Sequence, residues 1–279
     1  MADNGPGAPV CLETIRAGAV APGARAALFD FDGTLSLIRS GWLEIMLDMI
    51  VDDLSALGTG ETAEQLRAEA FHFVWPLTGK DTLYQMIEFA NAIRARGGTP
   101  LDPQIYKQRF LQALFEVSEK RIAALRDGLC PPDRYLVPGA RALLQDLHAR
   151  GLNLYLASGT DHDRLEHEAA LLHIAHYFEG DIYGALPDPD AFSKGMLVER
   201  IVNQPGMRGG LLIGFGDGPI EIAELHSAGA VAVGVATDEP ECREASPFKR
   251  RSLIDNGADY IVPNYLCRQA LLATLLGEP

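Results

Sequence analysis

The sequence predicts an α/β fold, a parallel sheet with helices on both faces, into which one all-helical segment is inserted. Three observations predict it. A short apolar run near the start of the chain ends in two aspartates, Asp30 and Asp32. The next hundred residues show only helical periodicity. From Val137 onward, apolar strands alternate with amphipathic helices.

The composition is that of a globular protein without general affinity for polyanions. The chain has 279 residues, 47% hydrophobic and 22% charged, which predicts one large or two ordinary domains. A formal net charge of -14 argues against binding to nucleic acid or to an anionic membrane surface. An anionic substrate must therefore be attracted locally, by a metal ion or by a few cations. The sequence leaves the oligomeric state open.

Neither a membrane span nor an export signal is expected. No apolar run reaches the roughly 18 to 20 residues of a span. The stretch MADNGPGAPV lacks the basic and apolar regions of a secretory signal, so a cytoplasmic location is expected. The four cysteines lie far apart, without a C-x-x-C pair, and are expected to be free thiols: Cys11, Cys130, Cys242 and Cys267.

The first expected elements are a leader and one buried strand. Residues 1–24 are rich in Gly, Ala and Pro, and we expect a partly ordered leader with one helical turn around Leu12 to Arg16. The apolar run over 26–31 predicts a strand buried on both faces. Such a strand ends at the carboxyl edge of the sheet, where open α/β sheets bind ligands.

A helical insertion follows this strand. Apolar residues recur at helical spacing, as in Leu43, Met46, Leu47 and Ile50, and no convincing strand is present. The expected helical segments are 40–57, 61–75, 79–96 and 102–127. Three aromatic side chains are expected in the core of the insertion: Phe71, Phe73 and Trp75.

Strands and helices then alternate to the end of the chain, as in a parallel sheet covered on both faces. The expected strands are 152–158, 180–185, 210–217, 230–236 and 258–265. The expected helices are 138–151, with Pro138 in the first turn, then 161–173, 194–202, 219–229 and a terminal helix. The run FKRR at 248–251 is expected on an exposed helix face. The four histidines between 162 and 176 lack the spacing of a metal site.

Four polar patches fall at strand ends or in loops just after them. They are DFDGT at 30–34, ASGT at 157–160, SKG at 193–195 and GDGPIE at 216–221. Three carboxylates drawn together, Asp30, Asp32 and Asp217, would repel one another, which a hard cation such as Mg²⁺ relieves through oxygen ligation. Lys194 and Ser158 would supply an ammonium and a hydroxyl to phosphate oxygens. Together the patches predict a phosphoryl-transfer site.

In content and order these patches resemble the four motifs of the haloacid dehalogenase superfamily, in its phosphatase branch. The resemblance implies a Rossmann-like catalytic core over 25–36 and 137–279. It implies that Asp30 is the nucleophile, which forms an aspartyl-phosphate, and that Asp32 is the general acid and then the general base. It also implies a Mg²⁺ ion held by Asp30, the backbone carbonyl of Asp32, and Asp217.

The same resemblance implies how phosphate and the remaining carboxylate are used. Ser158, Gly159 and Lys194 would bind the phosphate and stabilise the charge of the transferring group. Glu221 stands one helical turn beyond Asp217, where many relatives carry Asp. It is expected to reach the metal through a water molecule or to orient Lys194.

The insertion, residues 37–136, resembles the C1-type cap of phosphoglycolate-phosphatase-like and β-phosphoglucomutase-like members. A cap of this type implies a small phosphorylated metabolite as substrate, because a closing cap blocks bulky macromolecules. The loop 76–82 offers Thr78, Gly79 and Lys80 as candidates for reading the substrate. A plain interhelical turn explains the same loop equally well.

The expected function is therefore Mg²⁺-dependent hydrolysis of a small phosphomonoester, with three alternatives. A phosphomutase would use the same aspartates. A phosphonate hydrolase would need a cap lysine for a Schiff base, which Lys80, Lys107 or Lys120 could provide. A non-catalytic binding module would predict eroded motifs, whereas all four are intact. The dehalogenase branch is disfavoured because its chemistry needs neither Asp32 nor Asp217.

Overall fold

The chain divides into two compact units. The computed structural model describes residues 11–78, 80–186, 193–239 and 241–278. One unit consists of Met1–Ile38 with Leu125–Pro279, and the other of Arg39–Ala124. The second unit lies within the insertion expected over 37–136, whose role as a functional cap stays a prediction. No helix in the described part of the chain combines the length and apolar character needed to cross a bilayer.

The first unit contains a seven-stranded sheet in the order β1-β7-β6-β5-β2-β3-β4. All neighbouring strands are parallel except β1, which pairs antiparallel with β7. The strands are β1 (Glu13–Thr14), β2 (Ala26–Asp30), β3 (Asn153–Asp161), β4 (Ile182–Ala185), β5 (Leu212–Gly216), β6 (Val231–Val235) and β7 (Tyr260–Val262). The predicted α/β class and all six predicted strands are confirmed.

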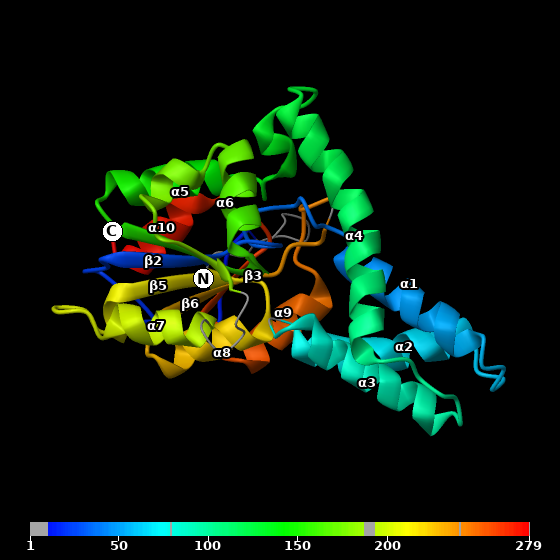
Figure 1. Cartoon of the computed structure of the whole chain (residues 1–279). Helices are drawn as coiled ribbons and strands as arrows, with labels where there is room; N and C mark the ends of the chain where they lie inside the picture. Colours follow the sequence, from blue (N-terminus) through cyan, green and yellow to red (C-terminus); the bar gives the residue numbers. More distant parts are fainter. Residues whose placement is uncertain (1–10, 79, 187–192, 240, 279) are drawn as a thin grey trace. The chain divides into compact units, whose positions relative to one another are not determined.

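Helices cover both faces of this sheet. Figure 1 shows α5 (Ala140–Ala149) and α10 (Arg268–Leu276) on one side, and α7 (Lys194–Val202) and α8 (Pro219–Ser227) on the other. The first unit also contains α6 (His162–Leu171), α9 (Pro247–Asp255), η2 (Pro132–Tyr135), η3 (Ala175–Phe178) and η4 (Gly209–Leu211). The prediction that Pro138 lies in the first turn of its helix is wrong, because the N-cap of α5 is Gly139 in a left-handed conformation with φ of 84°.

Side-chain alternation along β2 determines where Asp30 points. Successive residues of a strand face opposite sides of the sheet, so Leu28 and Asp30 share one face. Leu28 belongs to a core cluster with Leu197 of α7 and Leu225 of α8. Asp30 is therefore directed toward the face that these two helices cover.

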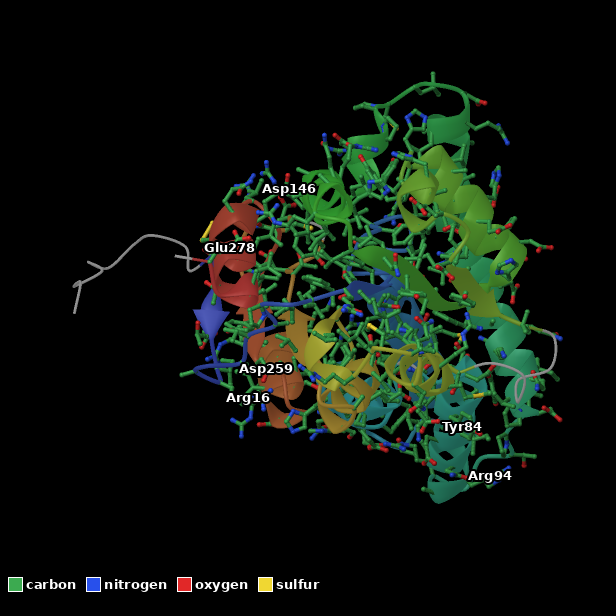
Figure 2. The ribbon with its side chains drawn as sticks, turned by 90° about the vertical axis from the view of Figure 1, so that its left-hand side faces the viewer. Arg16, Tyr84, Arg94, Asp146, Asp259 and Glu278 are labelled. Atoms are coloured by element: carbon green, nitrogen blue, oxygen red, sulfur yellow. A yellow bond between two sulfur atoms is a disulfide. The ribbon has the colours of Figure 1, made fainter. Side chains whose placement is uncertain are left out.

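The segment before β2 is bound to the sheet and is not helical where a helical turn was expected. The prediction around Leu12 to Arg16 is wrong because Glu13–Thr14 form the edge strand β1. The backbone N–H groups of Ile15 and Arg16 both donate to the carbonyl of Asp259. Figure 2 shows Arg16 beside Asp259, whose carboxylate accepts from Arg16 Nε at 2.5 Å. Non-local pairing here overrides local propensity.

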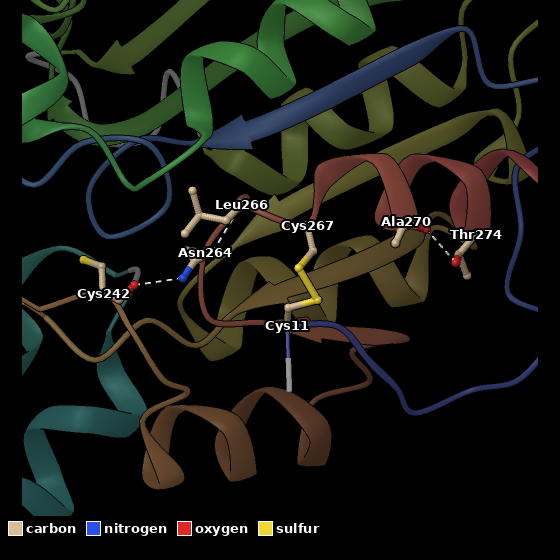
Figure 3. The surroundings of a disulfide bond; sticks show 7 residues. All are labelled: Cys11, Cys242, Asn264, Leu266, Cys267, Ala270 and Thr274. Carbon is tan, nitrogen blue, oxygen red and sulfur yellow. Dashed lines mark hydrogen bonds between the residues drawn. A yellow bond between two sulfur atoms is a disulfide. The ribbon is translucent and has the colours of Figure 1, made fainter. Parts of the chain in front are cut away.

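A disulfide bond joins Cys11 to Cys267, the N-cap residue of α10 (Figure 3). The expectation that all four cysteines are free thiols is therefore wrong for this pair, whereas Cys130 and Cys242 are in no disulfide among the described residues. The two bonded cysteines are 256 residues apart in the sequence. Their approach depends on the pairing of β1 with β7, which no local spacing reveals.

The second unit is built from helices. Its helices are α1 (Trp42–Ser55), α2 (Ala63–Val74), η1 (Trp75–Leu77), α3 (Thr82–Ala95) and α4 (Pro103–Arg126), the last of which extends two residues into the first unit. No strand occurs among its described residues, 39–78 and 80–124. Met46, Ile50 and Phe89 are fully buried in its core, and Trp75 packs there with Phe71 and Phe73 against it. The predicted helical segments are confirmed, and of the three aromatic side chains expected in the core, Trp75 lies in it while Phe71 and Phe73 are only partly buried against it.

Candidate active site

Asp30 and Lys194 form an ion pair at the carboxyl end of the central strand. Asp30 ends β2 and its side chain is only 8% exposed. Lys194 Nζ donates to Asp30 Oδ1 at 2.5 Å and lies 3.6 Å from Glu221 Oε1. Lys194 is the first residue of α7, and Ser193 caps this helix by accepting from the backbone N–H of Met196 at 3.1 Å. The two carboxylates offset the unfavourable position of a cation at a helix N-terminus.

Asp217 and Glu221 are delivered by the end of β5 and the first turn of α8. Glu221 Oε1 accepts from the backbone N–H of Gly218 at 2.9 Å, so the side chain folds back over its own helix start. Glu221 Oε2 is buried and has no hydrogen-bond partner within the described residues. One oxygen each from Asp30, Asp217 and Glu221 lies within 4.8 Å of the others. This oxygen set suits a hard divalent cation.

The electrostatics of this acidic cluster favour an added cation. Burial raises the pKa of Asp30 to about 8, although the ammonium of Lys194 opposes the shift. Burial also raises the pKa of Asp217 to about 6, against the opposing effect of Lys249. Burial lowers the pKa of Lys194, but Asp30 and Glu221 outweigh it and the net shift is upward. An orphaned carboxylate oxygen, raised acid pKa values and three converging carboxylates all fit a Mg²⁺ ion.

Asp32 lies outside this cluster and has a different environment. Its Oδ2 accepts from Thr160 Oγ1 at 3.2 Å. Thr160 is in turn fixed because its backbone N–H donates to Ser158 Oγ at 3.1 Å. Ligation of a metal by the Asp32 backbone carbonyl stays a prediction.

Gly33 makes room for Asp217 directly after the two aspartates. Its φ is +75°, which disfavours a side chain, and an added Cβ would lie 2.2 Å from Asp217 Oδ2. Thr34 Oγ1 donates to Asp30 Oδ2 at 3.5 Å. In the DGT sequence, Gly33 thus allows a left-handed turn and the close approach of Asp217, and Thr34 supplies a hydroxyl donor to Asp30.

The second patch lies on an extension of β3. Ala157 pairs in register with Asp30, and β3 continues to Asp161, beyond the strand end expected from the sequence. Ser158 is buried, whereas Gly159 is exposed. The Asp161 side chain makes no cap hydrogen bond to α6. Phosphate binding by Ser158 and Gly159 stays a prediction.

Sequence reasoning missed two residues beside Asp217. Lys249 Nζ donates to Asp217 Oδ2 at 2.9 Å and to Glu239 Oε1 at 2.8 Å. The prediction that FKRR lies on an exposed helix face is wrong for Lys249, which is 6% exposed, although the side chain of Arg251 is 83% exposed. The available signal was helical spacing, since Lys249 stands four residues before the fully buried Leu253.

Among the described residues, the other predicted candidates are not members of this cluster. No histidine joins the metal-capable group found among the described residues. In the loop before α3, Asp81 caps the helix by accepting from the backbone N–H of Leu83 at 2.7 Å. Lys80 Nζ lies 5.9 Å from the centre of the Tyr84 ring, and Thr78 Oγ1 is buried without a partner among the described residues. Gly79 is outside the described residues.

Comparisons with known proteins agree with this geometry. A family model described as a haloacid dehalogenase-like hydrolase matches residues 24–229. No curated protein matches the chain. A predicted phosphoglycolate phosphatase from Haemophilus somnus is 17% identical, with a TM-score of 0.57 and coverage of 90% of this chain and 98% of that one. A predicted β-phosphoglucomutase from Bacteroides vulgatus is 18% identical, with a TM-score of 0.56, and the match covers 92% of this chain and 91% of that one.

A third similar structure contains a metal. It is a predicted haloacid dehalogenase hydrolase from Bacillus subtilis bound to magnesium. The identity is 16%, the TM-score 0.50, and the match covers 77% of this chain and 90% of that chain. At these identities the structural likenesses establish the fold.

Proposed function

Because the chain belongs to the haloacid dehalogenase-like hydrolases, we propose that it hydrolyses a small phosphorylated metabolite in a Mg²⁺-dependent reaction through an aspartyl-phosphate. The observation that carries this proposal is the convergence of Asp30, Asp217 and Glu221, with Lys194 bonded to Asp30. Such an arrangement supplies a nucleophile, a cation site and a fixed positive charge at one sheet edge. These are the parts that phosphoryl transfer requires.

The metal would be held by Asp30, by the backbone carbonyl of Asp32 and by Asp217. When bound, Mg²⁺ neutralises the carboxylates and polarises a phosphate oxygen. Glu221 Oε2 has no hydrogen-bond partner among the described residues, which supports a part for this residue at the same site, either directly or through water. The magnesium in the similar Bacillus subtilis structure supports the choice of ion.

Asp30 would attack the phosphorus in line with the ester oxygen. The new bond joins an Asp30 carboxylate oxygen to phosphorus, while the phosphorus–ester bond breaks. Asp32 gives its proton to the leaving oxygen. In the second step Asp32 takes a proton from water, the water oxygen attacks phosphorus, and the Asp30–phosphorus bond breaks. Inorganic phosphate leaves and both aspartates return to their starting states.

The remaining residues would hold the phosphoryl group. Lys194, the Ser158 hydroxyl and the Gly159 N–H would donate to its oxygens, where preorganised charge stabilises the transition state. Asp30 and Asp32 lie in different environments, and a bound cation would keep the Asp30 carboxylate ionised although burial raises its pKa. Asp30 lies among carboxylates beside an ammonium, whereas Asp32 accepts from the hydroxyl of Thr160. A nucleophile must stay unprotonated and an acid must hold its proton.

Residues 37–136 would form a cap that reads the substrate, with Thr78, Gly79 and Lys80 in its recognition loop. A phosphomutase is the second candidate, because the chain resembles a predicted β-phosphoglucomutase in fold. The two functions differ in the acceptor of the phosphoryl group. A phosphatase transfers it from the aspartate to water, whereas a mutase transfers it to a second sugar hydroxyl. Incubation with hexose phosphates separates them, since hydrolysis yields free phosphate and a mutase yields an isomeric hexose phosphate.

A direct test is Mg²⁺-dependent phosphate release from p-nitrophenyl phosphate, followed by a screen of phosphorylated metabolites. The expected result is activity in the wild type that EDTA abolishes and Mg²⁺ restores. Asp30→Asn should be inactive, whereas Asp127→Asn, at a side chain that is 52% exposed, should behave as the wild type. Metal-independent release, or full activity of Asp30→Asn, would contradict the proposal.

A further inference from the structure

We propose that Lys249 is a positioning residue for Asp217 and that Glu239 holds Lys249 in place. This inference rests on the proposed Mg²⁺ site and assigns to it two residues outside the four motifs. Lys249 comes from α9, and Glu239 from the loop between β6 and α9. Their contacts place an ammonium against one side of the carboxylate that would bind the metal.

Lys249 is buried between two carboxylates. Its side chain is 8% exposed, and its ammonium lies between Asp217 at 2.9 Å and Glu239 at 2.8 Å. Burying an ammonium is costly unless it is paired and hydrogen-bonded. Two carboxylates satisfy this ion, and both are themselves largely shielded, at 11% and 13% exposed. Because burying this ammonium costs desolvation free energy, its place beside a candidate metal ligand indicates a function at that site.

The contact with Lys249 also restrains Asp217 from one side. Lys249 donates to Oδ2 of Asp217, and one oxygen of this carboxylate lies within 4.8 Å of oxygens of Asp30 and Glu221. Gly33 closes in on the same side, because a Cβ at this position would meet Asp217 Oδ2 at 2.2 Å and Glu239 Oε1 at 3.2 Å. With Oδ2 held, the carboxylate has little freedom to rotate away from the cluster.

Helix α9, which carries Lys249, is itself anchored. Arg250, next to Lys249, donates to the Glu13 carboxylate of β1 through both Nε and Nη2. The backbone N–H of Ser246, just before α9, donates to the carbonyl of Ala236 at 2.7 Å. The Lys249 backbone is thus fixed relative to the sheet that carries Asp217. Partners that orient a metal ligand in this way commonly change metal affinity 10- to 100-fold when removed.

Removal of Lys249 distinguishes positioning from simple charge repulsion. If the ammonium only repels the metal ion, its loss should tighten binding. If it positions Asp217, its loss should weaken binding. Mn²⁺ is a suitable probe, since it takes the same oxygen ligands as Mg²⁺ and its binding can be followed by electron paramagnetic resonance without substrate.

We expect Lys249→Met to raise the Kd for Mn²⁺ by roughly 10- to 100-fold. Glu239→Gln should raise it less, because Lys249 keeps its bond to Asp217. Lys249→Arg should bind more tightly than Lys249→Met, because it restores a cationic donor. Arg251→Met is the matched control on the same helix, where the side chain is 83% exposed, and its Kd should equal that of the wild type.

Asp217→Asn separates this inference from the proposed function. If Asp217→Asn binds Mn²⁺ as the wild type does, the proposed metal site fails and the inference fails with it. If Asp217→Asn loses binding while Lys249→Met binds with unchanged or higher affinity, only the positioning role is overturned. Should Lys249→Met not fold, Glu239→Gln decides, and an unchanged Kd in that variant overturns the role of the pair.

Discussion

Lys194 Nζ lies 2.5 Å from Oδ1 of Asp30, although 164 residues separate the two in the chain. The contact joins the first residue of α7 to the last residue of the central strand. It combines the first and third motifs in one ion pair, with Glu221 from the fourth motif 3.6 Å from the same ammonium. The account of catalysis proposed above depends on this shared cation.

Replacing Lys194 with Met should lower kcat for phosphate release by about 10²- to 10³-fold, the usual effect of losing one preorganised charge donor. The exposed Lys120 offers a matched control, and Lys120→Met should keep wild-type kinetics. Steady-state kinetics at saturating Mg²⁺ provide the measurement. Activity of Lys194→Met within twofold of the wild type would remove this lysine from the mechanism.

Gly33→Ala should destabilise the protein by a few kcal/mol, because the new Cβ combines left-handed backbone strain with a clash. Its Cβ would lie 2.2 Å from Asp217 Oδ2, whereas no atom of the described residues lies within 4 Å of a Cβ at Gly151, whose φ is a similar +78°. Gly151→Ala therefore isolates the backbone strain, roughly 1–2 kcal/mol. Urea unfolding measures the loss in the free energy of unfolding for each of the two variants. Equal losses in the two variants would mean that the approach of Asp217 to Gly33 is unimportant.

Stabilisation by Mg²⁺ should increase with pH. The pKa values of Asp30 and Asp217, about 8 and about 6, lie above the ordinary range of aspartate. The metal-free folded state therefore binds more protons than the unfolded state, and its stability is lost as the pH rises through these values. Mg²⁺ replaces those protons, so the rise in Tm that it causes should be larger near about pH 8.5 than near about pH 5. Equal shifts at the two pH values would contradict this linkage.

Lys80→Ala should raise KM for the physiological substrate more than it lowers kcat. Asp81, and not Lys80, caps α3, so the change should leave the start of this helix intact. The ammonium of Lys80 lies 5.9 Å from the centre of the Tyr84 ring. A residue that binds substrate and transition state equally changes KM alone. Kinetics with the best metabolite from the screen test this expectation, with Lys120→Ala as control. An unchanged KM would exclude the loop from substrate recognition.

Local patterns predicted those parts of the molecule that are determined locally. The apolar strands, the helix over 194–202 and the helical insertion follow from period-two and period-3.6 spacing. Asp30 and Asp217 were expected together because parallel strands bring their carboxyl ends to one edge. The third carboxylate expected there was Asp32, whereas the structure brings Glu221 to this cluster instead.

The features that were missed depend on contacts between distant segments. β1 has only two residues and exists through its pairing with β7. The Cys11–Cys267 bond follows from that pairing. Lys249 stands in a run of cations that resembles a solvated surface, and its burial depends on Glu239 and Asp217 from other segments. Helical spacing from the buried Leu253 could indicate the buried face, but no pattern along the chain identifies Glu239 and Asp217 as the partners of Lys249.

Asp32→Asn gives the most direct access to the central claim, that Asp30 carries the phosphoryl group. p-Nitrophenolate leaves without a proton, so this variant should form the intermediate but lack the base that hydrolyses it. The account predicts a burst of p-nitrophenol equal to the enzyme concentration and, on peptide mapping, phosphate attached to Asp30. The double variant with Asp30→Asn should give no burst. A burst that persists without Asp30, or a label on another residue, would contradict it.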